Sequence, residues 1–158
     1  MLGWMEQSAL GHFMRDSSLW TYPIVNLLHI LGLASLFGAT LIIDLRLLGL
    51  WRRVPIAALA DATVPVAKAG FFVAVATGTG LLATKATEYA GNPYLFIKFG
   101  AIALGLGNVF VLYRMPAWRQ LRERLPTPAD DRRLAAMGGI SLASWVTAVA
   151  AGRLIAYW

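Results

Sequence analysis

The chain has 158 residues, of which 58% are hydrophobic and 14% are charged, and its mean hydropathy is +0.62. Soluble domains carry about 25% charged residues, so the composition indicates one domain that lies mostly in lipid. The formal net charge of +6 comes from arginines that cluster between apolar runs, which argues against a nucleic-acid partner. The lack of cysteine excludes disulfides, thiolate nucleophiles and iron–sulfur sites.

The N-terminal segment, residues 2–15, is too short to cross a bilayer. It combines Trp4, Leu10 and Phe13 with polar residues, which predicts a helix lying in the membrane interface. The segment lacks the continuous apolar core and small-residue cleavage site of a signal peptide. The first span is therefore expected to act as its own signal-anchor.

Four apolar segments reach the roughly 20 helical residues that a bilayer core of about 30 Å requires. They are residues 22–43, 64–84, 94–113 and 134–155. The predicted fold class is all-α, a bundle of four transmembrane helices in one domain, residues 1–158. In the last segment small residues recur every four positions, at Ser144, Ala148 and Gly152, which is typical of closely packed membrane helices.

The charges of the connectors predict the orientation. Connectors 44–63 and 114–133 carry most of the arginines, whereas connector 85–93 ends in a Gly-Asn-Pro turn. Because cytoplasmic loops are enriched in Lys and Arg, the two arginine-rich connectors are expected in the cytoplasm. The sequence therefore predicts a bacterial inner-membrane protein with both termini on the periplasmic or exterior side.

Ionisable side chains inside spans are costly, which makes each a functional candidate. His29 lies roughly 10 Å below the outer boundary of the first span at 1.5 Å per residue, and Lys98 and Arg153 lie near the same boundary in the third and fourth spans. We expect a polar site in the outer leaflet. Its predicted ligand-binding residues are His29, Lys98, Arg153, Asn26, Asn108 and Trp145. The alternative is that Lys98 and Arg153 extend to the interface and that a neutral His29 bonds another helix.

A second polar group lies at the cytoplasmic boundary. Asp44 and Arg46 end the first span, and Lys68 opens the second. Residues two apart on a helix point in different directions. We therefore expect a structural ion pair between Asp44 and Lys68, or between Asp44 and an arginine of connector 114–133, with Arg46 nearby.

Several motifs resemble those of a largely uncharacterised bacterial family of small four-span inner-membrane proteins. The most specific are Asp-Leu-Arg-Leu-Leu-Gly at residues 44–49 and the closing Gly-Arg of residues 152–153. The likeness also includes the run 20–32, Gly38, Thr77-Gly78, Asn92-Pro93, Lys98, Asn108, Trp145 and the end of the chain to Tyr157. It therefore covers nearly the whole chain.

The resemblance implies an architecture rather than a mechanism. It marks His29, Asp44, Arg46, Lys98 and Arg153 as residues of the family pattern. The family often has a glutamate in place of Asn26 and a histidine in place of Tyr113, so a two-histidine site within the spans is not expected here.

Three functions stay open. The first is a membrane subunit that either binds a small anion or quinone-like head group or serves as an accessory scaffold, and it is expected to form a homo-oligomer or part of a larger membrane complex. The second is electron transfer through haem b, with His29 as axial ligand, Lys98 and Arg153 on the propionates and His12 as second ligand. The third is an oligomeric transporter of an anion or other small solute. No hydrolase motif occurs, so an enzyme is not expected.

Overall fold

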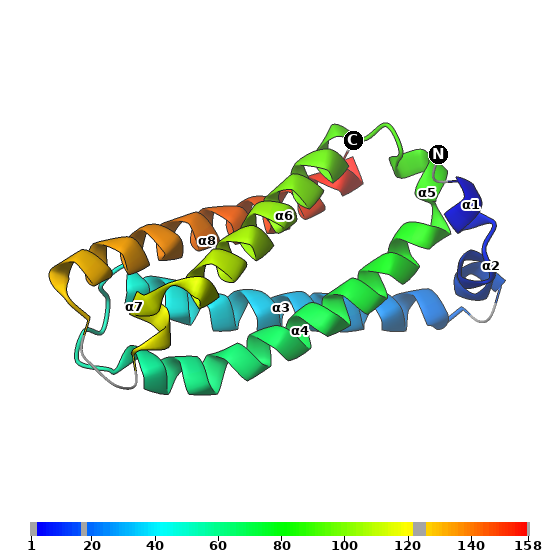
Figure 1. The fold of residues 1–158 in the computed structure, drawn as a ribbon. Helices are drawn as coiled ribbons and strands as arrows, with labels where there is room; N and C mark the ends of the chain where they lie inside the picture. The colour runs from blue at the N-terminus through cyan, green and yellow to red at the C-terminus, as the bar shows by residue number, and fades with distance from the viewer. Residues whose placement is uncertain (1–2, 17–18, 122–125, 158) are drawn as a thin grey trace.

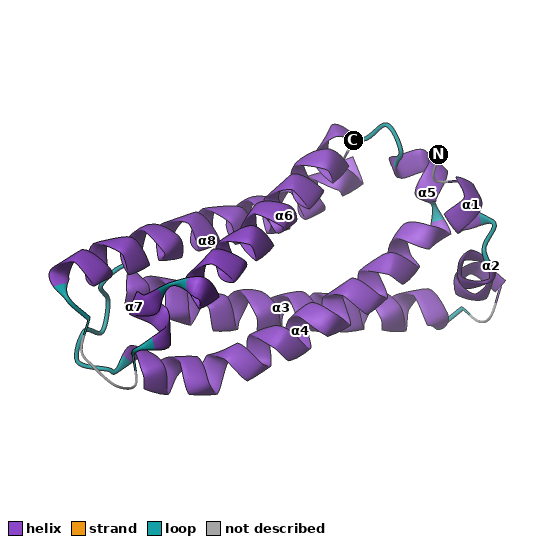
Figure 2. Ribbon diagram, viewed as in Figure 1, coloured by secondary structure: helices purple, strands orange, loops and turns teal. Residues whose placement is uncertain are grey.

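The computed structural model describes residues 3–16, 19–121 and 126–157 (Figure 1). The elements in chain order are α1 (Gly3–Glu6), α2 (Ala9–Asp16), α3 (Thr21–Leu47), α4 (Ile56–Thr84), α5 (Ala86–Tyr89), α6 (Pro93–Arg114), α7 (Pro116–Arg119), α8 (Pro128–Leu154) and the 3₁₀ helix η1 (Ile155–Tyr157). The described part of the chain contains no strand (Figure 2). Helices α3, α4, α6 and α8 are long and apolar enough to cross a membrane. The all-α four-helix fold is thus confirmed, and the chain is a multi-pass membrane protein.

Two of the four long helices extend well beyond the apolar segments seen in the sequence. Helix α4 begins at Ile56, directly after Pro55. Helix α8 begins at Pro128, where Thr127 and Asp130 form a capping box: Thr127 Oγ1 accepts from Asp130 N, and Thr127 N donates to Asp130 Oδ2. Hydropathy marks only the part of a helix that lies in lipid, whereas a proline or a cap decides where the helix begins.

The long helices form two antiparallel hairpins, α3 with α4 and α6 with α8, and these join mainly through α3 and α8. Helices α4 and α6 scarcely contact each other, so the hairpins diverge toward the end where both termini lie, here called the terminal end (Figure 1). At the opposite end, the connector end, a hydrophobic core closes the bundle. It consists of Ile43, Leu47, Ile56, Leu112, Ala117 and Leu134.

Glycines bring the helices of the first hairpin into backbone contact. A Cβ atom on Gly70 would lie 2.6 Å from Leu36 N and 2.7 Å from Gly32 O. A Cβ atom on Gly32 would lie 2.9 Å from Ala74 N. Any larger residue at Gly32 or Gly70 therefore forces α3 and α4 apart, because backbone atoms cannot move aside as a flexible side chain can.

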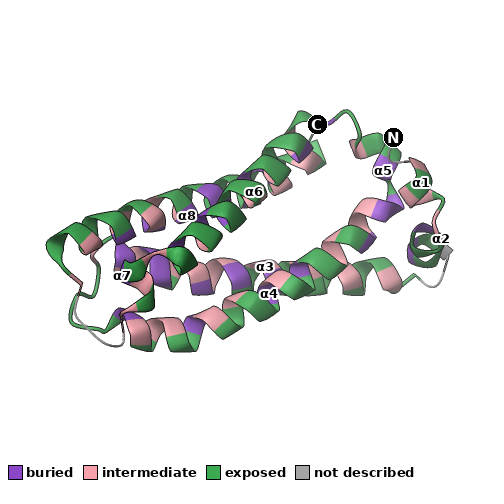
Figure 3. Cartoon of the chain, viewed as in Figure 1, coloured by how far each residue is buried: buried purple, intermediate pink, exposed green. Residues whose placement is uncertain are grey.

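The outward faces of the long helices are apolar and exposed (Figure 3). Phe72 of α4 and Phe96 of α6 are 71% and 67% exposed, which decides against their belonging to a protein core within this chain. Large apolar side chains on the outside and closely packed small residues on the inside are the pattern of helices surrounded by lipid.

The two short N-terminal helices pack against the terminal end of α4 and against α5. Met14 is buried over Gly80, and Arg15 Nη1 donates to Thr84 O at 3.4 Å. Glu6 Oε2 accepts hydrogen bonds from Thr87 N at 3.0 Å and from Thr87 Oγ1 at 2.5 Å. The segment predicted as one interfacial helix is thus two helices docked on the bundle; its position in the interface stays a prediction.

We predict that Gly70→Ala lowers the free energy of unfolding by about 1–3 kcal/mol, the usual cost of overpacking a close contact. Gly107→Ala is the matched control, because a Cβ atom there meets nothing within 4 Å. Thermal unfolding in detergent, followed by helical circular dichroism, measures both. Equal midpoints for Gly70→Ala and the unchanged protein would contradict the close contact between α3 and α4.

The N-terminal docking is expected to depend on pH. Hydrogen bonds from Thr87, first from its side chain and then from its backbone, lower the pKa of Glu6 below its ordinary value of 4.5. An acid whose pKa is lower in the folded protein stabilises it above the ordinary pKa, and the contribution is lost as pH falls through the lowered value. We expect α1 and α2 to exchange amide hydrogens faster relative to α4 in Glu6→Gln at neutral pH, since the amide mimics the protonated acid. Unchanged exchange would show that Glu6 does not hold them.

Candidate functional site

His29 lies on the side of α3 that faces α4, and it has a hydrogen-bond partner on that helix. Its Nδ1 atom lies 3.0 Å from Thr77 Oγ1. Thr77 Oγ1 itself donates its single hydrogen to Val73 O at 2.6 Å. With that hydrogen on Val73 O, Thr77 accepts from His29, and in this arrangement Nδ1 carries the hydrogen and Nε2 presents a lone pair.

The residue after Thr77 makes room for the imidazole. A Cβ atom on Gly78 would lie 2.9 Å from His29 Cε1 and 3.4 Å from Nδ1. A side chain at Gly78 would therefore displace the ring from Thr77. Thr77 thus orients the His29 ring through a hydrogen bond, and Gly78 leaves the space in which the ring is partly buried.

Lys98 of α6 extends along the second hairpin. Its side chain packs on Gly152 of α8, where a Cβ atom would lie 3.5 Å from Nζ and 3.6 Å from Cε. Within the described residues, Lys98 Nζ has no hydrogen-bond acceptor. Lys98 belongs to the second hairpin and His29 to the first, and both lie in the half of the bundle nearest to the terminal end (Figure 1).

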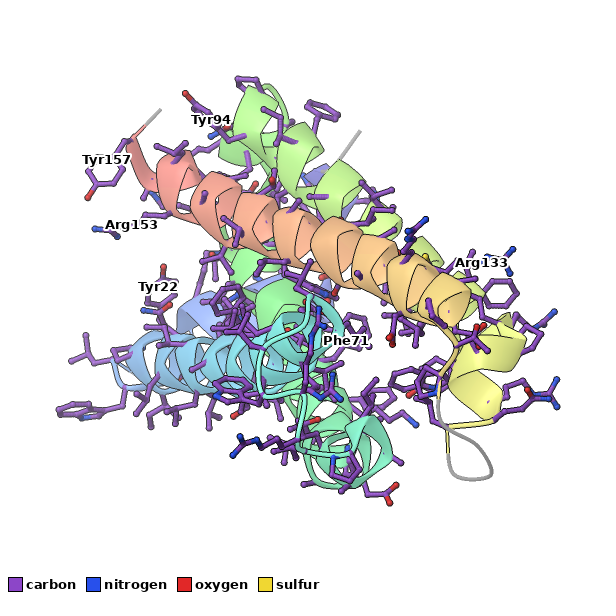
Figure 4. The ribbon with its side chains drawn as sticks, turned by 90° about the vertical axis from the view of Figure 1, so that its left-hand side faces the viewer. Tyr22, Phe71, Tyr94, Arg133, Arg153 and Tyr157 are labelled. Atoms are coloured by element: carbon purple, nitrogen blue, oxygen red, sulfur yellow. The ribbon has the colours of Figure 1, made fainter. Side chains whose placement is uncertain are left out.

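The other residues predicted for the outer-leaflet site are placed differently. Arg153 is exposed: its Nη2 donates to the Tyr157 hydroxyl at 2.6 Å, and its guanidinium carbon lies 5.0 Å from the centre of that ring. Figure 4 shows both side chains projecting from the end of α8. Asn26 is half-buried on α3, three residues before His29.

Asn108 and Trp145 lie deeper, at the contact between α6 and α8. Asn108 Nδ2 donates to Met137 O at 3.0 Å. The Trp145 ring packs on Gly105, where a Cβ atom would lie 3.3 Å from Cε2. Asn108 is ten residues along α6 from Lys98, about 15 Å at 1.5 Å per residue. The two residues therefore belong to a separate polar group rather than to the neighbourhood of His29 and Lys98.

The residues expected to form the structural ion pair do not meet in the described part of the chain. Asp44 is buried and bonds the Ser141 side chain. Arg46 donates to the loop carbonyls of Val54, at 2.7 Å, and Arg52, at 3.2 Å. Lys68 Nζ instead lies 5.9 Å from the centre of the Tyr113 ring. The difference arises because the helices turn Asp44 toward α8, while Arg46 turns toward the loop that follows α3.

A cleft at the connector end was not found from the sequence. It has a volume of about 560 Å³ and lies between α4 and the α6–α7 segment. Its lining includes Lys68, Tyr113, Trp118 and Arg119, and the Tyr113 and Trp118 rings pack edge to face at 5.8 Å. The lining of the cleft comes from segments far apart in the sequence, so no local motif marks it.

The described residues contain no group of three or more His, Cys, Asp or Glu side chains placed to hold a metal ion. His12 is exposed on α2.

These features define a multi-pass membrane protein built from two helical hairpins, with polar side chains turned inward at two levels. The chain belongs to the family of unknown function DUF6644, which it matches over residues 1–158. This agrees with the expectation of an uncharacterised family that covers the chain. Neither the curated proteins nor the solved structures gave a match.

We predict that the neutral His29 side chain carries its hydrogen on Nδ1. Nitrogen NMR of histidine-labelled protein distinguishes the two tautomers. Thr77→Val removes the acceptor and is expected to increase the Nε2-protonated form. Thr79→Val is the matched control, because the Thr79 hydroxyl bonds Val75 O of its own helix at 2.8 Å. A predominantly Nε2-protonated His29 in the unchanged protein would contradict the assignment.

Proposed function

We propose that this chain is a ligand-binding membrane protein that holds the polar head group of a membrane-soluble amphiphile between its two hairpins. The observation that supports it best is the ammonium group of Lys98, which packs on Gly152 without an acceptor among the described residues. A charge within a membrane helix is costly unless it is paired or reaches water. A bound head group near His29 would supply the partner.

The chemistry of the two side chains indicates the class of ligand. Lys98 can only donate hydrogen bonds, whereas His29 Nε2 can only accept one in the tautomer that Thr77 imposes. One hydroxyl group complements both, because its hydrogen points to His29 and its oxygen accepts from Lys98. A phenolic hydroxyl, as in a quinol, or a carboxylic acid has this pattern.

The arrangement of the hairpins supports entry from the bilayer. Helices α4 and α6 scarcely contact each other, and the hairpins diverge toward the terminal end (Figure 1). An apolar tail left in lipid and a head group near Lys98 would suit hairpins that contact each other so little at this end. Binding sites between helices of a bundle commonly combine apolar walls with a few polar groups.

We place this site in the periplasmic half of a bacterial inner membrane. The support is the arginine-rich sequence of connectors 44–63 and 114–133, which the positive-inside rule assigns to the cytoplasm. Both termini, at the same end of the bundle, would then lie on the periplasmic side. A homo-oligomer or a larger membrane complex would supply neighbours for the exposed apolar helix faces.

Haem b is a second candidate ligand, favoured by one observation. Metal-bound histidines usually donate through one ring nitrogen to an oxygen and bind the metal through the other. His29 has this arrangement, with Thr77 as the acceptor. An absorbance spectrum of protein purified with adequate haem supply tests this alternative. A Soret band that His29→Leu removes would favour haem, whereas a spectrum without a Soret band would favour the amphiphile as the ligand.

We predict that a decyl benzoquinol binds the purified protein and that Lys98→Met or His29→Leu weakens binding at least tenfold. A hydrogen bond to a charged group contributes about 1.5–3 kcal/mol, and 1.4 kcal/mol corresponds to a factor of ten. Isothermal titration in detergent measures the affinity. Decanoic acid, titrated in parallel, distinguishes an acid from a quinol.

Two controls accompany this titration. The dimethyl ether of the quinol keeps the tail but lacks the hydroxyl hydrogen, so it should bind more weakly. Arg153→Met should leave the affinity unchanged, because Arg153 is exposed and bonds Tyr157. Affinities that Lys98→Met and His29→Leu leave intact would place the binding site elsewhere.

A further inference from the structure

A second polar group, separate from His29 and Lys98, lies where α3, α6 and α8 meet. Asp44 of α3, Asn108 of α6 and Trp145 of α8 are only 4%, 6% and 5% exposed. Each has one buried polar atom without a hydrogen-bond partner: Asp44 Oδ2, Asn108 Oδ1 and Trp145 Nε1. Buried polar atoms are almost always bonded, so each of these three atoms requires an explanation.

The contacts of Asp44 and Asn108 show what each unpartnered atom can do. The carbonyl of Met137 can only accept, so the Asn108 amide nitrogen must face it, at 3.0 Å, and Oδ1 is left as an acceptor. The Ser141 side chain bonds the Asp44 carboxyl group, and the second carboxyl oxygen is the other acceptor. Two acceptors therefore lack a hydrogen.

Trp145 supplies a hydrogen-bond donor. Its indole nitrogen can only donate, and its ring lies on Gly105, one helical turn from Asn108 on α6. Asn108 bonds Met137 O of α8, Asp44 lies against Gly138 of the same helix, and Trp145 is eight residues beyond Met137, about 12 Å along α8. One donor and two acceptors thus lie within about two turns of α8, where α3 and α6 pack on it.

We propose that Asp44, Asn108 and Trp145 form a binding site for water inside the bundle. A water molecule has two hydrogens for Asp44 Oδ2 and Asn108 Oδ1, and a lone pair that accepts from Trp145 Nε1. Buried waters typically make about three hydrogen bonds to otherwise unpartnered groups. Such a water links the two hairpins, since Asp44 belongs to the first and the other two residues to the second.

The donor argues for water rather than a metal cation. A bound cation would use the two oxygens, but it would be repelled by the positive end of the Trp145 N–H bond. A hard cation such as Ca²⁺ also takes six to eight oxygen ligands. The described residues offer no metal cluster at this level of the bundle.

The experiment detects water at the Trp145 indole directly. The chain has six tryptophans, and Trp145→Phe assigns the Trp145 N–H signal in a spectrum of nitrogen-labelled protein. We expect a through-space cross-peak from this N–H to water in the unchanged protein, in the middle of the bundle. Absence of that cross-peak would overturn the proposal.

Two variants localise the water. Asn108→Leu removes one acceptor and should abolish the cross-peak. Ser144→Ala is the matched control and should retain it, because the buried Ser144 hydroxyl donates to Ile140 O of its own helix at 2.7 Å. A Trp145 signal that shifts when choline replaces Na⁺ would indicate a cation instead and would also overturn the proposal.

Discussion

The close approach of α8 to α3 at Gly138 is the contact on which the rest of the structure depends. A Cβ atom on Gly138 would lie 2.9 Å from Leu47 Cβ and 3.0 Å from Asp44 O. Because α4 and α6 scarcely touch, α3 and α8 carry the main contact between the hairpins. The same contact buries Asp44 against Ser141 and anchors the hydrophobic core at the connector end. The hairpins are therefore held at one end and diverge at the other.

The low dielectric of the bilayer explains why the polar side chains lie where they do. The inward face of α8 runs from Gly138 through Ser141 and Trp145 to Gly152, residues three, four and seven apart. Its small residues let α3 approach at Gly138 and let Lys98 extend over Gly152, while Trp145 fills the space between. One face of one helix thus contacts Lys98 at one level and Asp44 and Asn108 at another.

The sequence predicted the four spans because hydropathy depends only on local composition, and it placed His29 and Lys98 at similar depths because rise per residue is fixed. It did not separate Arg153 from them. The depth of a residue along a helix does not show which way its side chain points. Gly152 faces Lys98, whereas Arg153, the next residue, is turned by about 100° around the helix axis and bonds Tyr157. The partner of Asp44 was likewise inaccessible, since Ser141 is nearly a hundred residues away and only the α3–α8 contact joins them.

The proposed binding of a head group between His29 and Lys98 is tested most directly by a single-particle map of the protein in nanodiscs of its own membrane lipids. We expect separated α4 and α6 helices, with density that continues from the bilayer and ends between His29 Nε2 and Lys98 Nζ. Closed hairpins with Lys98 bonded to a protein acceptor, and no such density, would contradict it.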